Sequence, residues 1–190
     1  MSKTLPIKDL ATINKIKDYY IKEQNYRDLL LFLLAINTGL KLNFLLGLNV
    51  NDVKRKNSIE IPYEVGNGNA TPNNIKKEIF FNNEVKQLIK NLTQNSNAAE
   101  PLFKSKRGTR LERTTVFRNF KRVCKTLMLD DKISILSLRK TFGFHYYLKT
   151  KDLMFLQNFF NQSSISSTIN FIGINKDFDS SCNLTLAVNL

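Results

Sequence analysis

The sequence predicts an α+β domain that is dominated by helix, and three observations support this prediction. Most of the chain places apolar residues at the spacing of a helix face, whereas only residues 58–64 and 75–81 alternate with the period of a strand. The turn-rich stretch VGNGNATPNN separates these two segments, which predicts a single antiparallel hairpin. The chain has 190 residues, of which 42% are hydrophobic, so it can fill the core of one domain.

Helices are expected on both sides of the hairpin. Before it, apolar spacing predicts helices over residues 7–24, from residue 26 to Gly39, and over residues 42–46, followed by a turn at Asn51 and Asp52. After it, the same spacing predicts helices over residues 83–92, 114–127, 137–149, 152–160 and 163–171. Gly39 should end its helix because glycine readily adopts the left-handed conformation. Thr114 and Ser163 are expected to cap the helices that they begin.

The net charge is the most informative bulk property of the chain. Lys and Arg total 29 against 16 acidic residues, a formal net charge of +13. Such an excess is typical of proteins that bind nucleic acid, because each cation set against a phosphate releases condensed counterions. The alternative is a lysine-rich surface that faces solvent without a partner. Charge alone therefore favours a nucleic-acid partner and leaves this alternative open.

Other residue types argue against several classes of protein. Two cysteines and one histidine do not make a disulfide framework or a zinc site, so we expect no metal and no cofactor. No stretch approaches 18 uninterrupted apolar residues, and the opening residues contain no apolar signal segment. We therefore expect no membrane partner and a soluble, cytosolic protein.

Three separated segments resemble the motifs of one protein family. They are TGLKLNFLLGLNVNDVK (Thr38–Lys54), ILSLRKTFGFH (Ile135–His145) and FFNQSSISSTINFIGI (Phe159–Ile174). In this order, with the hairpin between the first and second, they resemble the catalytic domain of the tyrosine recombinases, or phage integrases. The resemblance implies the fold of that domain over residues 1–174, mostly α with a small antiparallel β-hairpin sheet. It also implies that the N-terminal core-binding domain of the family is missing, and it leaves residues 175–190 as a C-terminal tail.

The chemistry of the family explains what the matched positions would do. In the family, a tyrosine attacks a DNA phosphodiester, two arginines and two histidines hold its oxygens, and a hairpin lysine protonates the leaving oxygen. By the resemblance, the two family arginines correspond to Lys41 and Arg139, and the two histidines to Leu136 and Gln162. The hairpin lysine corresponds to Asn67, and the tyrosine to Phe171. Phe171 keeps the aromatic ring but lacks the hydroxyl that would form the ester. The resemblance therefore implies a degenerate site, a pseudo-enzyme that does not cut DNA.

The basic residues are expected to bind double-stranded DNA. The densest basic stretch is Lys104–Lys125, and by the resemblance it contains the helix that family members lay into the major groove. A second positive spot is expected at Lys41, Arg139 and Lys140, around the former phosphate site. The expected DNA contacts are Lys41, Lys104, Lys106, Arg107, Arg110, Arg113, Arg118, Lys121, Arg122, Lys125, Arg139 and Lys140.

The leading hypothesis is a catalytically inactive, recombinase-like DNA-binding protein, an accessory or regulatory partner in site-specific recombination or mobile-element biology. One alternative is a decoy that pairs with an active recombinase and does not need DNA. Another is an active recombinase with a relocated nucleophile at Tyr146, Tyr147 or Ser163. His145 lies nearly opposite Arg139 on its helix, so we expect a packing or surface role for it. The tail is expected either to dock on an active recombinase or a second copy of this chain, or to pack on its own domain.

Overall fold

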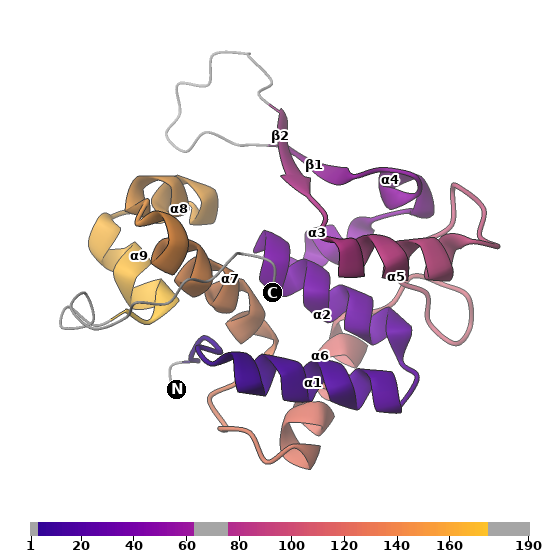
Figure 1. Cartoon of the computed structure of the whole chain (residues 1–190), viewed down its shortest axis with the longest axis horizontal. Helices are drawn as coiled ribbons and strands as arrows, with labels where there is room; N and C mark the ends of the chain where they lie inside the picture. Colours follow the sequence, from indigo (N-terminus) through magenta and orange to yellow (C-terminus); the bar gives the residue numbers. More distant parts are fainter. Residues whose placement is uncertain (1–3, 63–75, 175–190) are drawn as a thin grey trace.

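The computed structural model describes residues 4–62 and 76–174. Its N-terminal half contains α1 (Leu10–Lys22), α2 (Tyr26–Thr38), α3 (Leu42–Gly47), α4 (Val50–Val53), β1 (Ser58–Pro62) and β2 (Lys76–Phe80). After β2 follow α5 (Asn83–Thr93), α6 (Arg113–Thr126), α7 (Ile135–Thr150), α8 (Leu153–Phe160) and α9 (Ile165–Ile172). In Figure 1, α2 lies in the middle of the other helices, and the two strands lie at one edge.

The predicted mostly helical α+β class is confirmed. The described strands form one antiparallel sheet, in which Ser58 of β1 lies opposite Phe80 of β2. The predicted hairpin tip, with Asn67, and the tail over residues 175–190 lie outside the described residues. None of the helices in residues 4–62 and 76–174 combines the length and the apolar character needed to cross a membrane.

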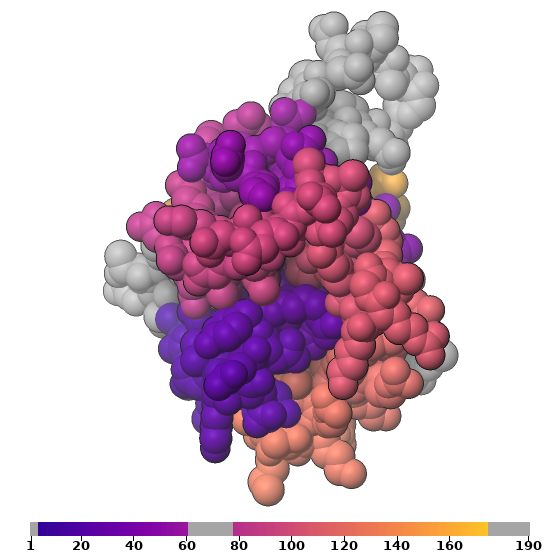
Figure 2. Space-filling model, turned by 90° about the vertical axis from the view of Figure 1, so that its right-hand side faces the viewer, coloured from indigo at the N-terminus to yellow at the C-terminus, as the bar shows by residue number. Residues whose placement is uncertain are grey.

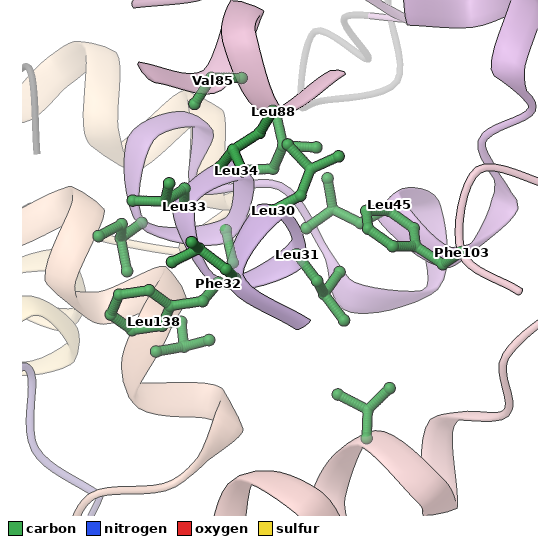
Figure 3. Close-up of a cluster of buried hydrophobic side chains, with 14 of the residues drawn as sticks. Leu30, Leu31, Phe32, Leu33, Leu34, Leu45, Val85, Leu88, Phe103 and Leu138 are labelled. Atoms are coloured by element: carbon green, nitrogen blue, oxygen red, sulfur yellow. The ribbon is translucent and has the colours of Figure 1, made fainter. Parts of the chain in front are cut away.

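Helix α2 is the centre of the core because its side chains are apolar on every side. Ten of its 13 residues are buried. A helix with this composition has to be covered all round, and α1, α3, α5 and α7 all contact it. Figure 3 shows Phe32 pointing toward Leu138 of α7, and Leu34 toward Leu88 of α5. The apolar composition of α2 thus explains why other helices cover it on several sides.

One predicted helix end is confirmed and two predicted caps are wrong. Gly39 has a φ of 64° and ends α2, as its sequence position predicted. The residue before α6 is Glu112, and Thr114 lies inside the first turn of that helix. The cap of α9 is Ser164 and not Ser163, because the extended backbone at Ser164 lets its hydroxyl accept from the third residue of the helix.

The predicted turn at Asn51 and Asp52 is also wrong, because both residues belong to the short helix α4. The carboxylate of Asp52 accepts a hydrogen bond from the backbone N–H of Asn49 at 2.7 Å. This contact satisfies one of the backbone donors that the start of a helix leaves without an internal partner. Asparagine and aspartate are common in both turns and helix starts, so composition did not distinguish the two structures.

Helices α7, α8 and α9 share a second apolar cluster, which α7 joins to the main core through its contact with α2. Gly143 of α7 makes their close approach possible. A Cβ atom at this position would lie 2.6 Å from side-chain atoms of both Phe160 and Ile172. Carbon atoms do not approach this closely without displacement, so the packing of these helices requires glycine here.

His145 holds the N-terminal segment against α7. Its side chain is 1% exposed, and its Nε2 lies 3.1 Å from the carbonyl oxygen of Ile7. The N–H of Ile7 donates to the hydroxyl of Thr141, at 2.9 Å. Burial lowers the pKa of His145, because the charged imidazolium is disfavoured away from water. The expected packing role of this histidine is therefore the one that the structure shows.

We expect the free energy of unfolding to decrease as the pH falls below the ordinary histidine pKa of 6.5. In that range the unfolded chain binds a proton at His145 that the native chain binds less readily, so protonation favours unfolding. For one proton the slope is at most about 1.4 kcal/mol per pH unit. Urea unfolding at a series of pH values measures this slope.

His145 is the only histidine in the sequence, so the variant His145→Gln is a direct control. Glutamine does not titrate, and the decrease in stability between pH 6.5 and about 5 should become shallower in the variant. If the two proteins had parallel stability profiles over this range, His145 would not be the responsible group.

Candidate nucleic-acid interface

A hollow of about 590 Å³ brings together most of the positions that the sequence motifs singled out. Its wall is built from α2, the start of α3, the start of α6, the start of α7, and residues of the α8–α9 region. Five of the six predicted family positions line it: Lys41, Leu136, Arg139, Gln162 and Phe171. The sixth, Asn67, lies outside the described residues. Three motifs that are far apart in the sequence therefore meet at one place.

Arg139, the residue predicted to match the second family arginine, is bound to two backbone carbonyl groups. Its Nη1 donates to the carbonyl oxygen of Gly39, and its Nη2 donates to that of Phe159 at 3.4 Å. The guanidinium carbon also lies 4.7 Å from the centre of the Phe160 ring. Burial lowers the pKa of Arg139 to about 10, so it still carries its charge at neutral pH. The guanidinium thus ties the end of α2 to the end of α8 while it lines the hollow.

Phe171 lines the hollow through an aromatic side chain that cannot bond to a phosphate. Its ring centre lies 4.9 Å from that of Phe160, and the ammonium of Lys140 lies 5.2 Å from the Phe171 ring centre. Leu136, which the sequence motifs predict to replace the first family histidine, is 47% exposed and likewise has no hydrogen-bonding group in its side chain. These two residues make this part of the wall apolar.

The cations expected to form the second positive spot differ in their surroundings. Lys140 is buried, and its ammonium donates to the carbonyl oxygen of Thr4 at 2.7 Å. Lys41 is exposed, at the residue before α3. Arg139 is partly buried and bound to carbonyl groups. Lys41 is therefore the member of this group that faces solvent, whereas the other two take part in internal contacts.

Helix α6 turns a basic face to solvent. Its apolar side chains Val116, Phe120 and Val123 are buried against the core. Its exposed cations are Arg118, Lys121, Arg122 and Lys125. Within residues 4–62 and 76–174, none of these four side chains pairs with a carboxylate. The charge of this face is therefore not neutralised by neighbouring side chains there.

The basic segment before α6 is used partly for internal contacts. The ammonium of Lys104 lies 2.5 Å from the carboxylate of Glu100. Arg110 donates to the carbonyl oxygen of Leu46 and, at 2.9 Å, to the side-chain oxygen of Asn49. The exposed cations of this segment without a described partner are Lys106 and Arg107. Figure 2 shows this part of the chain beside the indigo surface of the N-terminal helices and near salmon-coloured residues of the α6 region.

Sequence reasoning included Arg113 among the basic residues but missed the role of Phe117. Both side chains line the hollow, and the guanidinium carbon of Arg113 lies 5.1 Å from the ring centre of Phe117. Their separation of four positions places them on the same side of α6, and that spacing was visible in the sequence. The pair connects the hollow to the basic face of α6.

A buried carboxylate, also missed from the sequence, fixes α6 against α2. Asp28 is buried and lies 2.7 Å from the guanidinium of Arg27. It also accepts hydrogen bonds from the side-chain amides of Asn25, at 2.9 Å, and of Asn119 on α6, at 3.3 Å. The guanidinium of Arg27 donates in addition to the carbonyl oxygen of Lys104. These contacts orient α6 so that its cations face outward.

The candidates for a relocated nucleophile lie away from the hollow. Tyr147 is buried, and Tyr146 packs with its ring centre 4.6 Å from that of Phe155. Burial raises the pKa of Tyr146, which disfavours the phenolate form. Ser163 is exposed and is not part of the hollow. Among the described residues no tyrosine lines the hollow.

Comparison with known proteins gives one consistent family. A sequence profile of the phage integrase family matches residues 3–177. The probable integrase/recombinase YoeC of Bacillus subtilis (strain 168) is 35% identical over 175 residues, which cover 90% of this chain and 91% of YoeC.

Two solved structures share the fold. The structure of XerA recombinase has a TM-score of 0.69 and 16% identity, covering 93% of this chain and 62% of that chain. The Tn1549 transposon integrase, solved in complex with transposon right end DNA, has a TM-score of 0.69 and 18% identity, covering 95% of this chain and 64% of that chain. The chain thus spans less than two thirds of the length of either solved recombinase.

Replacing Arg139 with glutamine should reduce the free energy of unfolding by about 1–3 kcal/mol, because carbonyl groups at Gly39 and Phe159 lose a charged donor. Lys41→Gln removes a positive charge from the exposed rim of the same hollow and should change stability by no more than about 0.5 kcal/mol. Urea unfolding followed by circular dichroism measures both values. Equal stability of the two variants would show that the hydrogen bonds of Arg139 do not stabilise the fold.

Proposed function

The chain belongs to the phage integrase family, and from this membership we propose that it binds double-stranded DNA but does not cut it by the tyrosine chemistry of the family. Binding is assigned to the outer face of α6 and to the rim of the hollow beside it.

The observation that carries DNA binding is the basic face of α6. Four exposed cations on one helix face, with no carboxylate partner in the described part of the chain, are suited to a row of phosphates. Arg113 and Lys41 extend this positive surface to the rim of the hollow. The solved Tn1549 integrase, which has the same fold, is bound to DNA in its structure. The net charge of +13 supports the same partner.

The side chains of the hollow support the absence of cleavage. Ester formation needs a hydroxyl or another nucleophilic atom, and Phe171 has none. Leu136 cannot donate to a phosphate oxygen, and Lys41 lacks the planar pair of donors with which arginine orients one. Arg139 remains, but catalytic groups of this kind act as a unit, so a single one contributes little without the others.

A protein with these properties would act as an accessory or regulatory partner in site-specific recombination or in the biology of a mobile element, in the bacterial cytoplasm. It would bind DNA next to an active recombinase, or at the DNA site that an active recombinase uses, without forming a covalent protein–DNA link. The rival decoy hypothesis predicts no DNA binding, so the following measurement distinguishes the two.

Fluorescence anisotropy on a mixed-sequence duplex should show binding that weakens with salt, with a log–log slope of about −4 to −8. Each of the variants Arg118→Gln, Lys121→Gln and Arg122→Gln should reduce the magnitude of the slope by about 1, because each removes one phosphate contact. Lys90→Gln on α5 removes the same charge from an exposed position of another helix and should leave the slope unchanged. A lack of binding even at low salt would favour the decoy hypothesis.

On a nicked suicide substrate, which traps the covalent product of an active recombinase, we expect no protein–DNA adduct. The reason is the missing hydroxyl at Phe171. Denaturing gel electrophoresis detects an adduct directly, and an active recombinase serves as the positive control. An adduct that persists in Phe171→Ala but disappears in Tyr146→Phe or Tyr147→Phe would instead establish a relocated nucleophile.

A further inference from the structure

We propose that the hollow lined by Lys41, Leu136 and Phe171 binds a small amphipathic anion, a molecule that carries one carboxylate or sulfonate on an apolar body. The volume of about 590 Å³ lies within the range of about 300–1,000 Å³ that is usual for small-molecule sites. This ligand is distinct from DNA, and its binding does not require that the chain bind DNA.

The wall of the hollow provides the apolar half of the site. Phe171 and Phe160 lie against each other at one side, and Leu42 lies in the segment that begins α3. Two further lining side chains, Leu136 and Phe117, are 47% and 38% exposed. Large apolar side chains that remain in contact with water inside a concave site favour a ligand whose apolar body covers them.

The charged residues of the hollow are all of one sign. Lys41, Arg113 and Arg139 line it, and no aspartate or glutamate does so among the described residues. Lys41 and Arg113 are exposed and stand at the rim, so their charged ends can adjust to an anion. Cations beside a low-dielectric wall attract an anion more strongly than they would on an open surface.

The combination of the two halves specifies the ligand class. Free phosphate would satisfy the cations but would leave Leu136 and Phe117 in contact with water. A neutral hydrocarbon would cover these side chains but would leave Lys41 and Arg113 without an anion. A molecule with both an anionic group and an apolar body meets both conditions, and the amide of Gln162 can add a hydrogen bond.

Isothermal titration calorimetry with dodecanoate, kept below its critical micelle concentration, tests the proposal. We expect one molecule to bind per chain, with dodecan-1-ol and inorganic phosphate each binding at least about tenfold more weakly, since each lacks one of the two recognised parts. If the alcohol bound as well as the carboxylate, the cations would play no part. If phosphate bound as well as dodecanoate, the apolar wall would play no part. Either result would overturn the proposal.

Two pairs of variants localise the binding. Leu136→Asp places a like charge in the hollow and should weaken dodecanoate binding at least about tenfold. Met154→Asp, at an exposed apolar position of α8 outside the hollow, is its control and should bind normally. Lys41→Gln combined with Arg113→Gln should weaken binding about tenfold, whereas Lys90→Gln should not.

Thermal unfolding of each variant checks that the fold is intact, and the exposure of Leu136 makes its replacement compatible with folding. Equal affinity of Leu136→Asp and Met154→Asp would show that dodecanoate binds elsewhere on the protein, and would overturn the proposal. Anisotropy and calorimetry on the unmodified protein separate the two hypotheses. In that protein, DNA binding without dodecanoate binding contradicts this inference alone, and the reverse result contradicts the proposed function alone.

Discussion

The contact between Arg139 and the end of α2 determines the geometry of the site. Helix α2 is buried on every side, so its position is set by the helices around it. Gly39 ends it in a left-handed conformation and presents a carbonyl group that accepts from Arg139. The same guanidinium reaches the carbonyl of Phe159 and stacks on Phe160. The hollow exists between these fixed elements, and the core therefore supports the site directly.

A second constraint orients the basic surface. The buried carboxylate of Asp28 receives hydrogen bonds from Asn25 at the start of α2 and from Asn119 on α6. A buried charge is stable only when it is paired and hydrogen-bonded, so these contacts restrict how α6 can rotate. With Phe120 and Val123 turned inward, the cations of α6 face solvent. The hydrogen bonds of Asp28 and the buried apolar side chains of α6 thus both fix the orientation of this helix.

The proposed functions follow from two parts of one surface that differ in character. The face of α6 carries four exposed cations, which suit a row of phosphates. The adjoining hollow is apolar where Leu136 and Phe171 line it and cationic at Lys41 and Arg113, which suits a small molecule with both characters. The two proposals thus assign DNA to the cations of α6 and a different ligand to the hollow beside them.

The sequence alone was sufficient for the mostly helical class, the single hairpin, the end of α2 at Gly39 and the family, because periodicity, glycine positions and motif spacing are properties of the chain itself. It also indicated which positions would meet, and five of them do line one hollow. It could not place the hairpin tip, which lies outside the described residues.

Only the tertiary structure decided which cations bind distant parts of the chain and which do not. Lys140 donates to the carbonyl of Thr4, and Arg110 donates to that of Leu46, and in each case the two partners are far apart in the sequence. Helical spacing reports which residues share a face of one element, but not which backbone groups of other elements lie opposite that face. The sequence therefore predicted the same role for Lys41 and Lys140, whereas in the fold Lys41 is exposed and Lys140 is buried.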